Sequence, residues 1–168
     1  VQGIIVPHVN TREEADAIAR AARYYPDGHR SVGGGRAHDY GVGVSMDEST
    51  RHINAETLVI PMIEDIQAVD NIDDILTVDG ADILHVAAGD LGQSMGNPGR
   101  TEVRRVMGDV IPKIRAGGKN VGVGGNNPAD ADGVAEFINL GANFVTVSAH
   151  GLLRLAAEDF RRRVQNAL

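Results

Sequence analysis

Two acidic residues each follow a stretch that is typical of a buried β-strand. Glu64 comes directly after residues 57–63, and Asp90 comes just after residues 82–88. The two acids are 26 residues apart (90 − 64), about one βα repeat, which returns the chain to the same edge of a parallel sheet. Because hard divalent cations prefer carboxylate oxygens, this spacing predicts a metal site at that edge. The alternative is that each acid stabilises the N-terminus of the helix behind it.

The backbone just before Asp90 is a second candidate for binding. Ala88 and Gly89 are small, so backbone N–H groups there can approach a carboxylate or phosphate closely. The alternative is a tight turn that requires Gly89. The only two lysines, Lys113 and Lys119, fall on a predicted helix and in the turn before a strand. Schiff-base chemistry within this chain is therefore not expected.

Histidines also lie near the ends of predicted strands. His8 follows Pro7 near the end of the first apolar run, and His150 follows the last run. His85 lies three residues before the end of its own strand and is expected to pack in the wall of the fold. For all three histidines we expect a structural or solvent role rather than a catalytic one.

An alternating order of strands and helices must position these residues. Five short apolar runs predict buried parallel strands over residues 3–9, 57–63, 82–88, 120–125 and 142–149. Amphipathic stretches predict helices over residues 10–25, 65–78, 101–118, 128–141 and 151–168. The least regular part is 29–56, with a short helix expected at 45–55, and a loop is expected at 89–100.

The composition limits the class of protein. With 168 residues, 42% of them hydrophobic, the chain suits a single α/β domain over residues 1–168. The net charge of −7 disfavours nucleic acid and anionic membranes as partners. No apolar run approaches the roughly 18 residues of a membrane span. The absence of cysteine is compatible with the cytoplasm, which is the expected location.

Two architectures accommodate five consecutive βα units. One is an open doubly wound sheet, which 168 residues can complete. The other is the last five units of a (β/α)8 barrel, which needs about 250 residues in full. Periodicity alone does not separate them. The chain opens at Val1 rather than Met and enters a strand almost at once, which favours the barrel and a start within a larger protein.

Three segments resemble motifs of the HpcH/HpaI aldolase family. They are GIIVPHVNTREEADAIARAARYYPDGHRSVGGGRA (3–37), LVIPMIEDIQAVDNIDDI (58–75) and GADILHVAAGDLGQSMGNPG (80–99). Members of that family are class II aldolases that depend on a divalent metal and act on 2-oxo acids. Their fold is a (β/α)8 TIM barrel, and this chain resembles strands 4–8 with their helices. The resemblance therefore implies that roughly three N-terminal βα units are absent.

The resemblance also implies roles for individual residues. Glu64 and Asp90 match the family's metal ligands, which implies Mg²⁺, Mn²⁺ or Co²⁺ as cofactor. The backbone at Gly89 and Asp90, next to Ala88, matches the seat of the pyruvate carboxylate, and Met62 lies where a side chain contacts the substrate. The implied reaction forms or cleaves a 2-oxo acid through a pyruvate enolate, with an aldehyde as the second reactant.

The chain departs from the family pattern in ways that keep other functions open. Met62 stands where the family usually has Gln, and the catalytic His and Arg of the family are expected upstream of Val1. One alternative is a related metal-enolate barrel enzyme of the citrate-lyase-like or phosphoenolpyruvate-mutase-like kind. Another is a diverged, non-catalytic barrel fragment that acts as a binding or assembly module.

The resemblance implies a homo-oligomer, because the family forms hexamers in which C-terminal helices pack across subunits. The C-terminal segment 152–168 carries apolar residues that such packing would bury. They are Leu152, Leu153, Leu155, Phe160 and Val164.

Overall fold

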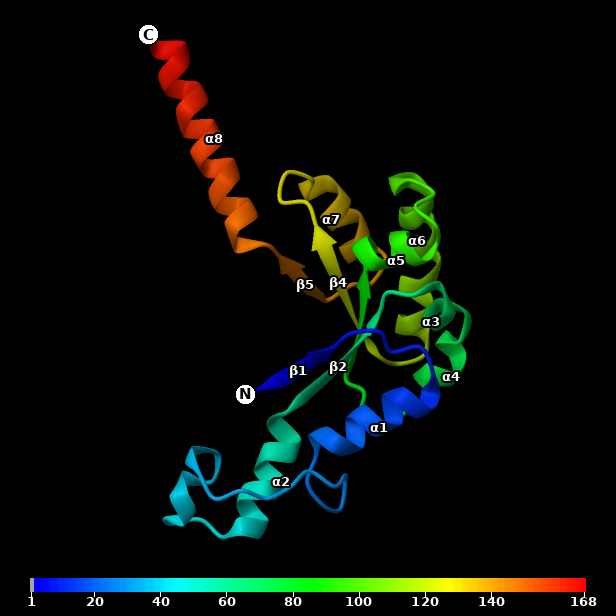
Figure 1. Cartoon of the computed structure of the whole chain (residues 1–168), viewed down its shortest axis with the longest axis vertical. Coiled ribbons are helices and arrows are strands. Elements are labelled where there is room, and N and C mark those ends of the chain that lie inside the picture. Colours follow the sequence, from blue (N-terminus) through cyan, green and yellow to red (C-terminus); the bar gives the residue numbers. More distant parts are fainter. Residues whose placement is uncertain (1) are drawn as a thin grey trace.

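The computed structural model describes residues 2–168, apart from the side chain of Asn126. Five parallel strands form one sheet in the order β1-β2-β3-β4-β5, and this sheet curls into an open half-barrel (Figure 1). The strands are β1 (Gly3–Val6), β2 (Leu58–Ile63), β3 (Ile83–Ala87), β4 (Asn120–Asn126) and β5 (Phe144–Val147). The α/β class is confirmed. The doubly wound alternative is excluded, because its strand order reverses at a switch point and this order does not.

Helices connect consecutive strands, and one more helix follows the last strand. They are α1 (Arg12–Ala22), α2 (Met46–Glu56), α3 (Ile66–Asp70), α4 (Ile72–Leu76), α5 (Ala88–Ser94), α6 (Arg100–Ala116), α7 (Ala131–Asn139) and α8 (Ala149–Ala167), with a 3-10 helix η1 (Arg36–Gly41) before α2. The short helix expected at 45–55 is α2. Helices α1 and α3–α7 contribute buried residues to one apolar core with the strands.

The two faces of the sheet differ because side chains alternate along each strand. One set of alternate residues on β3 and β4 joins the core with the helices, namely Leu84, Val86, Val121 and Val123. The other set faces the concave side and includes His85 and Gly122, which are register partners. The concave face is open at the first strands, where Ile5 is 45% exposed and Leu58 is 43% exposed.

The strand expected over residues 3–9 ends already at Val6, and two other predicted segments differ in kind. The single helix expected over 65–78 is divided into α3 and α4 at Asn71, whose φ of −93° and ψ of 11° are not helical. The Asn71 side-chain amide donates to the carbonyl oxygen of Asn10 at 2.9 Å, which holds this break against the segment between β1 and α1. The loop expected at 89–100 contains α5, where full burial of Leu91 stabilises helical turns that the neighbouring glycines disfavour.

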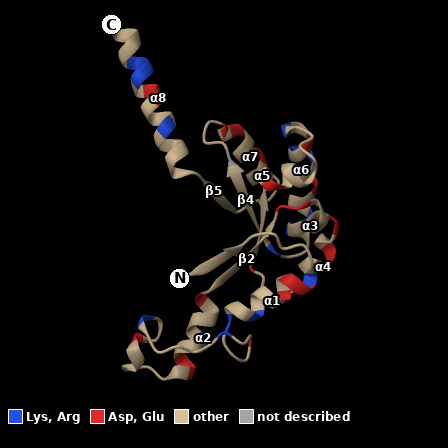
Figure 2. Ribbon diagram, in the orientation of Figure 1, with Lys and Arg blue, Asp and Glu red and all other residues tan. Residues whose placement is uncertain are grey.

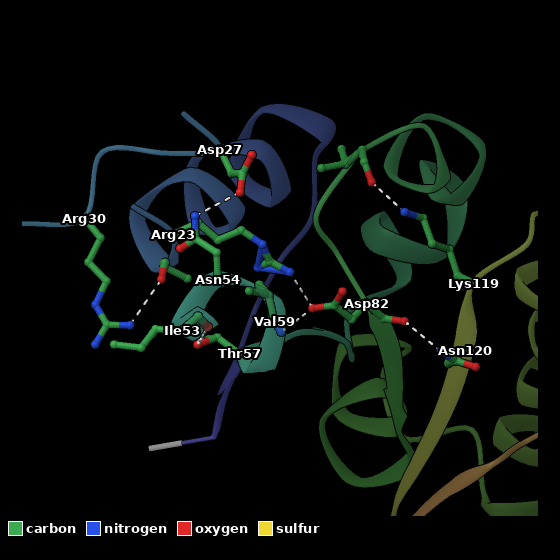
Figure 3. Close-up of polar contacts among 12 residues, drawn as sticks. Arg23, Asp27, Arg30, Ile53, Asn54, Thr57, Val59, Asp82, Lys119 and Asn120 are labelled. Atoms are coloured by element: carbon green, nitrogen blue, oxygen red, sulfur yellow. Dashed lines mark hydrogen bonds and ion pairs between the residues drawn. The ribbon is translucent and has the colours of Figure 1, made fainter. Parts of the chain in front are cut away.

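The edge where the strands begin is held together by Asp82, which precedes β3 (Figure 3). Its carboxylate accepts a 2.9 Å hydrogen bond from Arg23, the C-cap residue of α1, and a 2.7 Å bond from the backbone N–H of Val59 in β2. Its backbone carbonyl accepts from the side chain of Asn120 in β4. These contacts tie one helix and three strands together, so this edge serves the framework of the fold.

Helix α8 projects away from the rest of the fold (Figure 1), and none of its residues is buried. Its basic residues fall in two places along the helix, the larger group toward the C-terminus (Figure 2). Its exposed apolar residues include Leu153 and Phe160, which are 71% and 65% exposed. In the part of the chain that the structure describes, no helix combines the length and the apolar character of a membrane span.

Candidate metal and substrate site

Glu64 follows the last residue of β2 and is almost completely buried, with 2% of its surface exposed. Its Oε1 accepts a 2.9 Å hydrogen bond from the backbone N–H of His8, and the His8 imidazole Nδ1 lies 3.6 Å from the same oxygen. No Lys or Arg pairs with Glu64 among residues 2–168 as described. A buried carboxylate with so little counter-charge is costly, and a bound cation would offset that cost.

Asp90 lies in the first turn of α5, which begins directly after β3. It is exposed, and no described residue forms a hydrogen bond or an ion pair with it. Since β2 and β3 are parallel neighbours, Asp90 and Glu64 lie at the same edge of the sheet, as their spacing predicts. Neither acid is a helix N-cap, because Asp65 holds that position for α3 and Ala87 for α5.

His8 also lies at this edge of the sheet and contacts Glu64. Its backbone is left-handed, with φ of +53°, and this conformation accompanies the bond from its N–H to Glu64. Its Nδ1 lies 3.0 Å from Asp65 Oδ2. That hydrogen bond, followed by the negative charges of Glu64, Asp65 and Asp90, raises the pKa of His8. Sequence reasoning placed His8 near the functional edge, but only the backbone geometry reveals its contact with Glu64.

Ala88 and Gly89 present backbone N–H groups in the first turn of α5, which has no side-chain N-cap. Gly125 of β4 passes close to them with φ of +69°. A Cβ added to Gly125 would lie 3.7 Å from the Gly89 nitrogen and 3.8 Å from the Ala88 nitrogen. The predicted carboxylate seat therefore lies beside Asp90, and no side chain of Gly125 fills the space above it.

Met62 and His85 are register partners on β2 and β3, on the concave face below Glu64. Met62 is half-buried, and His85 is 3% exposed. Burial lowers the pKa of His85, which favours a neutral imidazole. The prediction that His85 packs within the wall of the fold is confirmed.

The chemistry of these donors fits a hard divalent cation. The described residues hold no cluster of three or more His, Asp or Glu side chains that would coordinate a metal unaided. Glu64 and Asp90 would therefore supply two oxygen ligands and leave the other positions to water and substrate, as Mg²⁺ commonly requires. The burial of Glu64 without a Lys or Arg partner among the described residues is the structural observation that supports such a cation.

The sequence model of the HpcH/HpaI aldolase/citrate lyase family matches residues 1–157. The 2-keto-3-deoxy-L-rhamnonate aldolase of Klebsiella pneumoniae subsp. pneumoniae is 36% identical over 161 residues, which are 94% of this chain and 59% of that protein. The chain thus spans about three fifths of the length of this curated relative.

Solved structures of the same family have a similar fold. An HpcH/HpaI aldolase/citrate lyase family protein from Burkholderia cenocepacia J2315 superposes with a TM-score of 0.83 at 27% identity, covering 98% of this chain and 65% of that one. A citrate synthase superposes with a TM-score of 0.78 at 29% identity, covering 99% of this chain and 64% of that one. On the combined strength of the sequence match, the fold and the two acids at one sheet edge, this chain belongs to the HpcH/HpaI aldolase/citrate lyase family.

Proposed function

We propose that this chain forms the C-terminal part of a (β/α)8 barrel, supplying strands 4–8. Among the described strands, β1 and β5 each pair on one side only, and a closed barrel would pair their free edges. The open concave surface at Ile5 and Leu58 supports the same proposal, because further inward-facing side chains would cover it.

The function we propose is a carbon–carbon lyase, a divalent-metal-dependent aldolase that acts on 2-oxo acids. In this proposal Glu64 and Asp90 hold Mg²⁺, Mn²⁺ or Co²⁺, which supplies Lewis-acid stabilisation of the negative charge that a 2-oxo acid develops as it enolises. The backbone N–H groups at Gly89 and Asp90 bind the carboxylate of the substrate. Met62 and Ala88 form part of the surrounding wall and help to orient the substrate.

One observation supports this proposal more strongly than any other. Glu64 is 2% exposed, yet its only hydrogen-bond donor among the described residues is the backbone N–H of His8. A carboxylate kept buried in this way is a cost to the fold that metal binding would offset. The aldolase names and the identity of 36% to a relative support lyase chemistry.

The direct test is aldol addition of pyruvate to a panel of aldehydes by the full-length protein. We expect 4-hydroxy-2-oxo acids as products, with activity lost in EDTA and restored by Mn²⁺, Mg²⁺ or Co²⁺. Glu64→Gln and Asp90→Asn should each lower kcat/KM at least 100-fold, which is about 2.7 kcal/mol of transition-state stabilisation. The control Asp47→Asn alters an exposed pair with Arg51 on α2 and should leave kcat/KM unchanged.

Other outcomes separate the alternatives. If the products come from a different 2-oxo acid condensation, the protein is a related metal-enolate enzyme rather than an aldolase. Binding of metal and pyruvate with no turnover of any substrate would favour a binding module. Full activity in the Glu64→Gln variant would refute the proposed site.

We also propose a homo-oligomer, a hexamer by family resemblance, that assembles through α8. A helix of 19 residues with none of them buried requires a further contact to cover Leu153 and Phe160. Light scattering on the wild type should give a mass several times that of one chain. Phe160→Asp should reduce the mass to that of a smaller species, and an unchanged mass would exclude α8 as the contact.

A further inference from the structure

His85 is the hydrogen-bonding side chain on the floor of the proposed site. In the sheet it pairs with Met62 on one side and with Gly122 on the other, and Gly122 pairs in turn with Phe144. Paired residues of parallel strands share a face. Across this row, Met62, Gly122 and Phe144 offer no side-chain N–H or O–H group. The row lies two residues, about 6.6 Å, below Glu64 along β2.

Two glycines make room for the imidazole. A Cβ added to Gly122 would lie 2.3 Å from Nδ1 of His85, and one added to Gly124 would lie 2.3 Å from Nε2. The ring therefore lies along β4, with the edge of Phe144 against it at 5.8 Å between ring centroids. Since β4 runs from Asn120 to Asn126, Nε2 is the nitrogen closer to the edge that carries the candidate site.

No described residue forms a hydrogen bond with the ring. Nδ1 is completely buried and has no hydrogen bond. Nε2 is not among the fully buried unpaired atoms, and no hydrogen bond joins it to a residue that the structure describes. Buried polar atoms in folded proteins are nearly always paired, so the unpaired Nδ1 is a cost to stability. Nε2, at the end of the ring nearer the candidate site, is left available for a partner in the functional state.

We propose that Nε2 of His85 donates a hydrogen bond to an oxygen atom of the 2-oxo acid bound at Glu64 and Asp90. His85 is then a residue that determines substrate specificity, and this inference rests on the proposed function. A neutral imidazole with its proton on Nε2 presents a donor toward the edge where the oxygen atoms of the substrate collect. Met62, its neighbour in the row, offers only an apolar thioether surface, so His85 alone in this row distinguishes an oxygen from a methyl group.

The test measures Mn²⁺ and pyruvate binding separately in the full-length protein, by electron paramagnetic resonance of Mn²⁺ and by calorimetry with pyruvate. His85→Phe keeps a flat ring over the two glycines but removes the donor. We expect Mn²⁺ affinity within twofold of the wild type and pyruvate affinity at least tenfold weaker. His85→Gln restores a donor and should bind pyruvate within threefold of the wild type. His52→Phe, on the exposed side of α2, is the control and should match the wild type in both titrations.

Each outcome decides the matter. Wild-type pyruvate affinity in His85→Phe would mean that His85 only fills space, and the inference would be wrong while the proposed function stands. If His85→Phe does not fold, as judged by thermal unfolding, His85→Leu provides the same comparison. A wild type that binds Mn²⁺ but no pyruvate would overturn the proposed function, and the inference with it.

Discussion

Replacing Glu64 by Gln should stabilise the metal-free protein while removing its response to metal. Gln has nearly the same shape and keeps an oxygen that accepts the hydrogen bond from His8 N–H. It removes a negative charge from a position that is 2% exposed. A buried ion costs several kcal/mol after relaxation, and the stronger bond to a charged acceptor offsets about 1.5–3 kcal/mol of that cost. The net expectation is a gain of about 1–2 kcal/mol in the free energy of unfolding.

The assay is thermal unfolding at pH 7.5, first in EDTA and then with Mn²⁺ at about 100 times its Kd. For a protein of this size the gain in EDTA corresponds to a rise of roughly 2–8 °C in Tm. Saturation with Mn²⁺ should then stabilise the wild type by about 2.7 kcal/mol and leave Glu64→Gln unchanged, which reverses their order. Glu158→Gln removes an exposed partner of Arg154 on α8. It should change the free energy of unfolding by less than about 0.5 kcal/mol, both in EDTA and with Mn²⁺.

Two results would refute this reasoning. If Glu64→Gln is less stable than the wild type in EDTA, the buried carboxylate stabilises the fold, and the argument that its burial is costly fails. If Mn²⁺ raises the Tm of Glu64→Gln as much as that of the wild type, the metal binds elsewhere.

Two further predictions concern stability. Because the pKa of His8 is raised in the folded state, its contribution to the free energy of unfolding is fully present below the unfolded pKa of about 6.5. That contribution is lost as pH rises through the folded pKa. In urea unfolding with EDTA, the stability difference between the wild type and His8→Asn should therefore shrink from pH 6 to pH 9, and a constant difference would contradict the role of the charges around His8. Gly28→Ala should lower the free energy of unfolding by about 2–4 kcal/mol, because a Cβ there would lie 2.1 Å from the Arg20 carbonyl oxygen and 2.5 Å from that of Arg23. Gly33→Ala, where a Cβ meets nothing within 4 Å, should change it by less than about 0.5 kcal/mol, and equal effects at the two glycines would count against this packing.

The strands and the edge that carries Glu64 and Asp90 were predictable because they depend on local patterns. Short β-branched runs identify buried parallel strands, and a spacing of one βα unit places the residues that follow them at one edge. The α/β class and the parallel sheet are confirmed on this basis. The assignment of both acids to a metal stays a prediction, because two carboxylates alone do not define a metal centre.

Other features depend on contacts between distant residues and leave no local signal. The break between α3 and α4 is held by a hydrogen bond from Asn71 to Asn10, 61 residues away in the sequence. Helix α5 forms in a glycine-containing segment because Leu91 is buried in the core. The bond from His8 to Glu64 requires a left-handed residue after β1, and nothing near His8 in the sequence indicates its partner.

The most direct test of the central claim is a Mn²⁺ titration of the wild type, Glu64→Gln and Asp90→Asn, followed by electron paramagnetic resonance. Asp47→Asn serves as the matched control, because its carboxylate is exposed on α2 and pairs only with Arg51 among the described residues. The account predicts one Mn²⁺ site in the wild type and the control, with an affinity at least tenfold lower in each of the other two variants, which is 1.4 kcal/mol or more. Equal Mn²⁺ affinity in all four proteins would contradict the account, because Glu64 and Asp90 would then not be the metal ligands.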